Sequence, residues 1–197
     1  MNKLLMWWLS LISKLHDRVW LPLWSNIRWQ GSPEKDQELS AQDHVTDLAS
    51  LYTVMRNLYA HFTWTADGGD QLLDAIIPPP QGYQQYLNGL LQDDCDGFHS
   101  TLYHMVAKSG WTCALLTVQA IGGGHCVLLC NIENKWRVCD YTCVYPEFAT
   151  ANEAVSHYNS VFPVMYFTKS EVFCNSFLQY DYHTGKLHSI SLEDLEK

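Results

Sequence analysis

Residues 95–141 limit the fold more than any other part of the chain, because their apolar periodicity changes from helical to strand-like at Gly110. Before that glycine the apolar residues repeat at helical spacing, at Phe98, Leu102, Met105 and Val106. Three apolar runs separated by turn-forming residues follow, at residues 111–121, 126–132 and 136–141. A helix followed by successive antiparallel strands is therefore predicted.

Three residues with the chemistry of a nucleophile site fall within this segment. Cys95 opens the helix, His125 opens a strand, and Asp140 ends the next strand. A cysteine nucleophile needs a base, and the base needs an orienting carboxylate. A helix N-terminus favours the thiolate of Cys95. The neighbouring carboxylates of Asp93, Asp94 and Asp96 oppose it, unless one of them caps the helix.

The predicted hairpin brings two of these residues together. A tight turn at Glu133-Asn134 places Leu129 opposite Val138 and Val127 opposite Asp140. His125 and Asp140 then share one face, about 7 Å apart at the backbone. We expect Asp140 to accept the Nδ1 proton of His125, and this face to pack on the Cys95 helix.

The segment 48–142 resembles the transglutaminase-like superfamily, in particular the bacterial transglutaminase-like cysteine proteinases. The motifs that carry the resemblance are Leu58-Tyr59-Ala60-His61-Phe62-Thr63-Trp64, Asp94-Cys95-Asp96-Gly97-Phe98, Gly124-His125-Cys126-Val127 and Trp136-Arg137-Val138-Cys139-Asp140. Members often carry Gly before the Asp-Cys pair, where this chain has Asp93. The resemblance implies an α+β fold with a papain-like or transglutaminase-like core, in which the nucleophile helix packs on an antiparallel sheet.

The same resemblance implies a cysteine hydrolase, a peptidase or amidase that works through Cys95, His125 and Asp140 and an acyl-enzyme, without a cofactor. The Cys95 amide and the Trp64 indole are candidate oxyanion donors; Gln92 and Asn88 are alternatives in the manner of papain-like enzymes. Transglutaminase or deamidase acyl transfer fits the same chemistry. A non-catalytic protein-interaction module is the alternative of a different class.

Composition narrows the partners. The formal charge of −9 disfavours nucleic acid and anionic membrane surfaces, which need clustered Lys and Arg, and favours a protein or peptide substrate with basic residues. Seven cysteines without regular spacing, and no convincing secretory signal, indicate a reducing cytoplasm. Cys126 and Cys130 are four strand residues apart, about 13 Å, which disfavours a zinc site with Cys139 and Cys143.

The chain is expected to comprise an N-terminal amphipathic segment with a linker (1–37) and a catalytic domain (38–197). Residues 1–12 are too short to span a bilayer. The main expectation is that Leu4, Trp8, Leu11, Leu15 and Val19 form a stripe that packs on the domain. The alternative is contact with a membrane surface through Trp7, Trp8 and Trp20.

Local patterns predict the remaining elements. A helix is expected from a capping box at Ser40 to Phe62, and loops at residues 67–70 and 78–80. After Asp140 we expect a helix at residues 151–158. Strands are expected at residues 161–167, 177–182 and 187–190. His99 and His104, on the Cys95 helix, are expected to be solvent-facing or packing residues.

Overall fold

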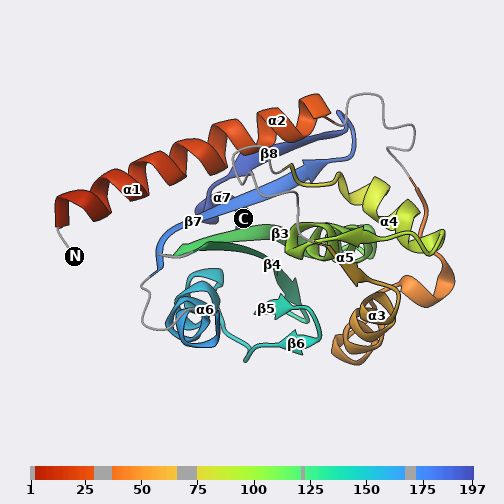
Figure 1. Ribbon diagram of the computed structural model, residues 1–197. Coiled ribbons are helices and arrows are strands. Elements are labelled where there is room, and N and C mark those ends of the chain that lie inside the picture. The colour runs from red at the N-terminus through yellow and green to blue at the C-terminus, as the bar shows by residue number, and fades with distance from the viewer. Residues whose placement is uncertain (1–2, 29–36, 66–74, 121–122, 167–171) are drawn as a thin grey trace.

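The computed structural model describes residues 3–28, 37–65, 75–120, 123–166 and 172–197. The fold is α+β: helices cover a six-stranded sheet in which every neighbouring pair is antiparallel, in the order β6-β5-β4-β3-β7-β8 (Figure 1). The strands are β3 (Thr112–Ala120), β4 (Gly123–Ile132), β5 (Lys135–Asp140), β6 (Cys143–Val144), β7 (Val172–Asp181) and β8 (Lys186–Ile190). The expected helix followed by antiparallel strands is thus present.

Two apolar cores lie on opposite faces of the sheet, which explains why its central strands are apolar on both sides. One face is covered by α3 (Leu48–Ala60), α4 (Pro79–Leu87) and α5 (Cys95–Lys108). The other is covered by α6 (Ala151–Tyr166) and the short α7 (Leu192–Leu195). In β4 the side chains alternate between these cores, with Cys126 and Leu128 toward α5 and Val127 and Leu129 toward α6.

The β4–β5 hairpin has the register predicted from the sequence. Leu129 lies opposite Val138. Glu133 and Asn134 form the turn with φ of 56° and 60°, the left-handed pair that a two-residue hairpin turn requires. Trp136 and Val138 both lie on the α6 face of β5, so the alternation carries Asp140 to that face as well.

Helices α1 (Lys3–Leu15) and α2 (Leu21–Arg28) join through the π-helical segment η1 (His16–Trp20) into one long helix beside β7 and β8 (Figure 1). Leu21 is buried in the α5-side core, and the Asn26 side-chain amide bonds both the N–H and the carbonyl of Leu187. None of the described helices is both long and apolar enough to cross a membrane.

Several local predictions were wrong. The helix expected from Ser40 begins at Leu48, because Asp47 and Ser50 form the capping box, while Ala41–Asp43 is one 3-10 turn. Buried Asp43 instead accepts hydrogen bonds from the hydroxyls of Tyr83 and Tyr86. Residues 79–80, expected in a loop, open α4, since proline suits the first helical turn.

The C-terminal half was predicted in part. The helix expected at residues 151–158 is present and longer, because α6 continues through residues 161–166, which were expected to form a strand. The last two strands are present as β7 and β8. The loop expected at residues 67–70 lies outside the described residues, and so do residues 29–36, which include most of the linker expected at the end of the segment 1–37.

Candidate active site

Cys95 is the first residue of α5, and two aspartates organise the turn that precedes it. The Asp94 carboxylate accepts the Asp96 amide at 3.0 Å and caps the helix, as the sequence suggested. The Asp93 carboxylate accepts the Asp94 amide at 3.0 Å. Both carboxylates therefore have local partners at the helix start.

Asp93 also explains the glycine two residues after the nucleophile. A Cβ atom added at Gly97 would lie only 2.5 Å from the Asp93 carboxyl carbon. The Asp93 side chain therefore occupies the space that any larger residue at position 97 would need.

His125 and Asp140 meet across the hairpin. The Nε2 atom of His125 lies 2.9 Å from Oδ1 of Asp140, and both side chains are nearly buried. The second carboxylate oxygen accepts the Tyr158 hydroxyl at 3.0 Å, and the His125 ring stacks on Phe162 with 5.7 Å between centroids. The predicted pairing is present, but the expected nitrogen was wrong: Asp140 contacts Nε2, not Nδ1. The carboxylate thus leaves Nδ1 for a second partner.

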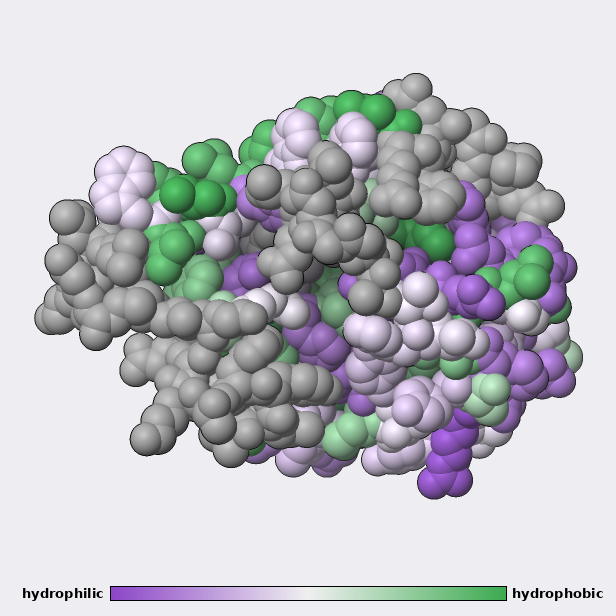
Figure 2. Space-filling model, viewed as in Figure 1, coloured by the Kyte–Doolittle hydropathy of each residue, from purple (hydrophilic) through white to green (hydrophobic). Residues whose placement is uncertain are grey.

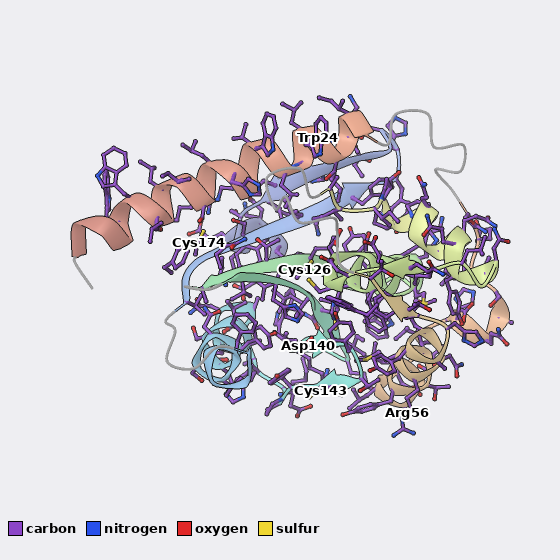
Figure 3. All side chains as sticks on the ribbon, viewed as in Figure 1. Trp24, Arg56, Cys126, Asp140, Cys143 and Cys174 are labelled. Carbon is purple, nitrogen blue, oxygen red and sulfur yellow. The ribbon has the colours of Figure 1, made fainter. Side chains whose placement is uncertain are left out.

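The sheet face was also predicted incorrectly. His125 and Asp140 contact α6 through Phe162 and Tyr158, whereas Cys95 belongs to α5 on the opposite face. The alternation rule fixed which residues share a face, but it could not say which helix covers that face. Figure 3 shows Cys126 on β4 and Asp140 on β5 between these two helices.

Cys95 and His125 approach each other at the part of β4 that β5 does not cover. Strand β5 pairs with β4 from Leu128 to Ile132, so the segment that carries His125 extends beyond it. There the backbone N–H of Cys126, which would otherwise point toward the next strand, donates to Sγ of Cys95 at 3.4 Å. The sulfur therefore lies at the strand edge, next in the chain to His125, where side chains from both faces can converge.

His99 joins the nucleophile turn to the end of β5. Its Nδ1 lies 2.6 Å from the Cys95 carbonyl, and its Nε2 accepts the Tyr141 amide at 3.0 Å. Since Nε2 accepts, the proton is on Nδ1 and the ring is neutral. Burial lowers the pKa of His99 to about 4, although Asp140, with Oδ1 at 3.9 Å, acts to raise it.

The surroundings of Cys95 favour the protonated thiol over the thiolate. Burial raises its pKa well above the ordinary value, with further contributions from Asp94, Cys126 and Asp96, while the hydrogen bond from the Cys126 amide acts to lower it. Cys95 as a whole residue is half-buried. The expectation that the helix N-terminus favours a thiolate is therefore not met at rest.

The side-chain candidates for the oxyanion donor are Trp64, Gln92 and Asn88, and all three lie on segments that precede Cys95 in the chain. Trp64 belongs to β1 (Thr63–Trp64), which pairs in parallel with β2 (Gln92–Asp93), so Trp64 lies opposite Asp93. Trp64 is 62% exposed, so it is not part of the apolar core. Gln92 is exposed, and Asn88 lies exposed at the end of α4.

One polar residue near the site was missed from the sequence. Gln119 lies opposite Gly124 across β3 and β4, and its amide oxygen would be 2.8 Å from a Cβ atom at position 124. The glycine before His125 thus makes room for an amide side chain on the α5 side of the sheet. No sequence motif marks Gln119, because only the register brings it there.

Two clusters, one of aspartates and one of cysteines, contain residue types that can bind metal ions. Among the residues described, carboxylate oxygens of Asp93, Asp94 and Asp96 lie within 4.8 Å of one another. The cysteines considered for zinc are arranged differently: Cys130 and Cys139 pack with their sulfurs 3.8 Å apart, and Cys143 is exposed. Neither of these two clusters includes His125 or Asp140.

Comparison with known proteins adds nothing to this geometry. No protein-family model matches the chain, and no curated protein sequence matches it significantly.

Tyr158 and His99 are further residues whose roles were missed from the sequence; both lie on helices and are buried. For His99 and His104 the expectation of packing is met and that of solvent exposure is wrong.

Proposed function

We propose that the protein is a cysteine hydrolase, a peptidase or amidase of the transglutaminase-like type, with a papain-like core. The observation that carries the proposal is the 2.9 Å contact of His125 Nε2 with Asp140, beside a sulfur that accepts the amide of the next residue, Cys126. A base oriented by a buried carboxylate next to a thiol is the arrangement that thiol acyl chemistry needs.

In this proposal His125 removes the proton from Cys95 as the sulfur attacks. Nδ1 of His125 takes the thiol proton while a bond forms between Sγ and the substrate carbonyl carbon. The C–N bond then breaks, and the imidazolium gives its proton to the leaving amine. Water, deprotonated by His125, hydrolyses the thioester and regenerates the thiol. Asp140 orients the ring and stabilises its cationic form.

The raised pKa of Cys95 favours one of two versions of this mechanism. A preformed thiolate and imidazolium pair would need a depressed thiol pKa. Here burial and the aspartates raise it, so proton transfer accompanies attack. The Cys95 amide is the first oxyanion donor by position, and Trp64 is the proposed second donor, because its strand pairs with β2 immediately before Cys95.

The chain's charge supports a class of substrate. Asp93 and Asp94 are half-buried beside Cys95, and the whole chain carries a formal charge of −9. A peptide segment with Lys or Arg near the cleaved bond would be attracted to this region. We propose a cytoplasmic protein or peptide as substrate and no cofactor.

The same high pKa favours one other function, a non-catalytic protein-interaction module, since a protonated thiol beside carboxylates is a weak nucleophile. A peptide-library cleavage screen on wild type, Cys95→Ala and the matched exposed-cysteine control Cys143→Ala separates the two. The hydrolase predicts cleavage that only Cys95→Ala abolishes. Cleavage retained in Cys95→Ala would contradict it, and neither cleavage nor a thioester adduct would assign the module.

Added methylamine distinguishes acyl transfer in the same assay. If the thioester is intercepted by the amine in preference to water, the product carries a methylamide in place of a carboxylate. A transglutaminase or deamidase function predicts conversion at glutamine side chains without backbone cleavage. Mass spectrometry of the products reads each of these outcomes directly.

A further inference from the structure

The helix 3–28, formed by α1, η1 and α2, exposes a continuous apolar stripe. Its members are between 37% and 58% exposed: Trp7, Trp8, Leu11, Ile12, Leu15, Val19, Trp20, Leu23 and Ile27. The sequence predicted that a stripe of Leu4, Trp8, Leu11, Leu15 and Val19 would pack this helix on the domain. The helix does lie against β7 and β8, but the last four of these residues are exposed, so the predicted packing side is wrong; the Leu4 side chain lies outside the described residues. Figure 2 shows hydrophobic residues along this helix at the upper edge of the molecule.

The domain holds the helix by its opposite side. Leu21 and Ser25 are buried, and Asn26 bonds the backbone of Leu187 on β8. With one side tied to the sheet, the helix can present only its outer side to a partner. Such a helix can lie on an apolar surface but cannot be surrounded by one.

The π-helical segment keeps the stripe straight. In an α-helix each residue turns by about 100°, so Leu23 would be rotated by about 80° from Leu15. The Leu21 amide instead bonds the His16 carbonyl five residues back, and this wider turn rotates less per residue. The rotation lost across η1 returns Leu23 and Ile27 to the side of Leu15, where both are exposed.

Charge is segregated onto the same helix. Residues 1–28 contain four Lys or Arg and one acidic residue, a formal charge of +3, so the other 169 residues hold eight against twenty, or −12. The whole-chain charge used above to disfavour anionic membranes conceals this division. Lys14 and Arg18, one turn apart, are exposed beside the stripe. A second copy docked on the same stripe would bring these cations together.

We propose that the outer side of helix 3–28 binds a phospholipid bilayer surface containing anionic lipid, with the helix axis in the membrane plane. Tryptophan and aliphatic side chains enter the headgroup boundary, while Lys14 and Arg18 contact headgroup phosphates. This orientation places the acidic domain on the solvent side of the helix. The proposal does not depend on the function proposed for Cys95.

Sedimentation of the full chain with vesicles of phosphatidylcholine and phosphatidylglycerol (about 3:1) tests it. The wild type is expected to bind, and Ile12→Glu with Leu15→Glu should lower the partition coefficient by about tenfold or more, since two exposed apolar contacts are lost. The matched control is Leu90→Glu: Leu90 is 63% exposed in the loop between α4 and β2. It should bind like the wild type.

Three results would overturn the proposal. They are absence of vesicle binding, equal binding by the Ile12→Glu, Leu15→Glu variant, and stripe-dependent dimerisation by light scattering without vesicle binding. Lys14→Glu with Arg18→Glu should weaken binding at low salt and leave it nearly unchanged at high salt. Because the substituted side chains are exposed, each variant should remain folded, and thermal unfolding checks this.

Discussion

Acidification should destabilise the protein through His99, and His99→Gln should remove that part of the loss. The pKa of His99 is lowered from 6.5 to about 4, chiefly by burial. The unfolded chain therefore binds a proton as the pH falls below about 6.5, whereas the folded protein does so only near 4. The stability that neutral His99 provides is present above about pH 6.5 and is lost between these values, in total about 3 kcal/mol and about 2 kcal/mol by pH 5.

Guanidinium unfolding at about pH 7.5 and about pH 5 measures this difference for each variant. The glutamine can make one donor and one acceptor contact without titrating, so His99→Gln should lose about 2 kcal/mol less than the wild type over this range. The control is His188→Gln, at an exposed position on β8, which should retain the wild-type loss. An equal pH dependence in wild type and His99→Gln would refute the assignment of a buried, neutral His99.

Three further predictions concern the site. Asp140→Asn should reduce the rate of peptide hydrolysis by about 10²-fold with a smaller effect on thermal stability, since the base loses its orienting charge; a severe fall in melting temperature would assign Asp140 to structure. Tyr158→Phe removes a hydrogen bond to that carboxylate and should cost about 1.5–3 kcal/mol in chemical denaturation, with slower hydrolysis; unchanged stability would contradict the contact. Because the pKa of Cys95 is raised, its rate of alkylation should still be rising at about pH 9; a plateau at neutral pH would indicate a thiolate.

The local geometry of the site was accessible from the sequence because it depends on short-range rules. Cys95 at a helix start, the Asp94 cap and the Leu129 and Val138 register all follow from periodicity and turn chemistry. The contact between His125 and Asp140 followed from that register. These features involve residues close in the chain, or paired across one two-residue turn.

Long-range packing was not accessible in the same way. Alternation along β4 assigns His125 to one face, but both faces are apolar, so nothing in the strand distinguishes α5 from α6 as the cover. The prediction for the N-terminal stripe failed for a related reason. Amphipathic spacing shows that a helix has an apolar side, but it does not show that this side packs on the domain. The roles of Tyr158 and Gln119 depend on contacts made only in the folded chain.

The most direct test of the account is alkylation of Cys95 by iodoacetamide, followed by intact mass in a Cys143→Ser background. All seven cysteines fall within the described residues: Cys143 is exposed, Cys95 is half-buried, and the other five are buried. The account predicts one adduct, mapped to Cys95, that forms about 10²-fold more slowly when His125→Gln removes the base. A Cys95 that reacts no faster than buried Cys113, or at a rate independent of His125, would contradict it.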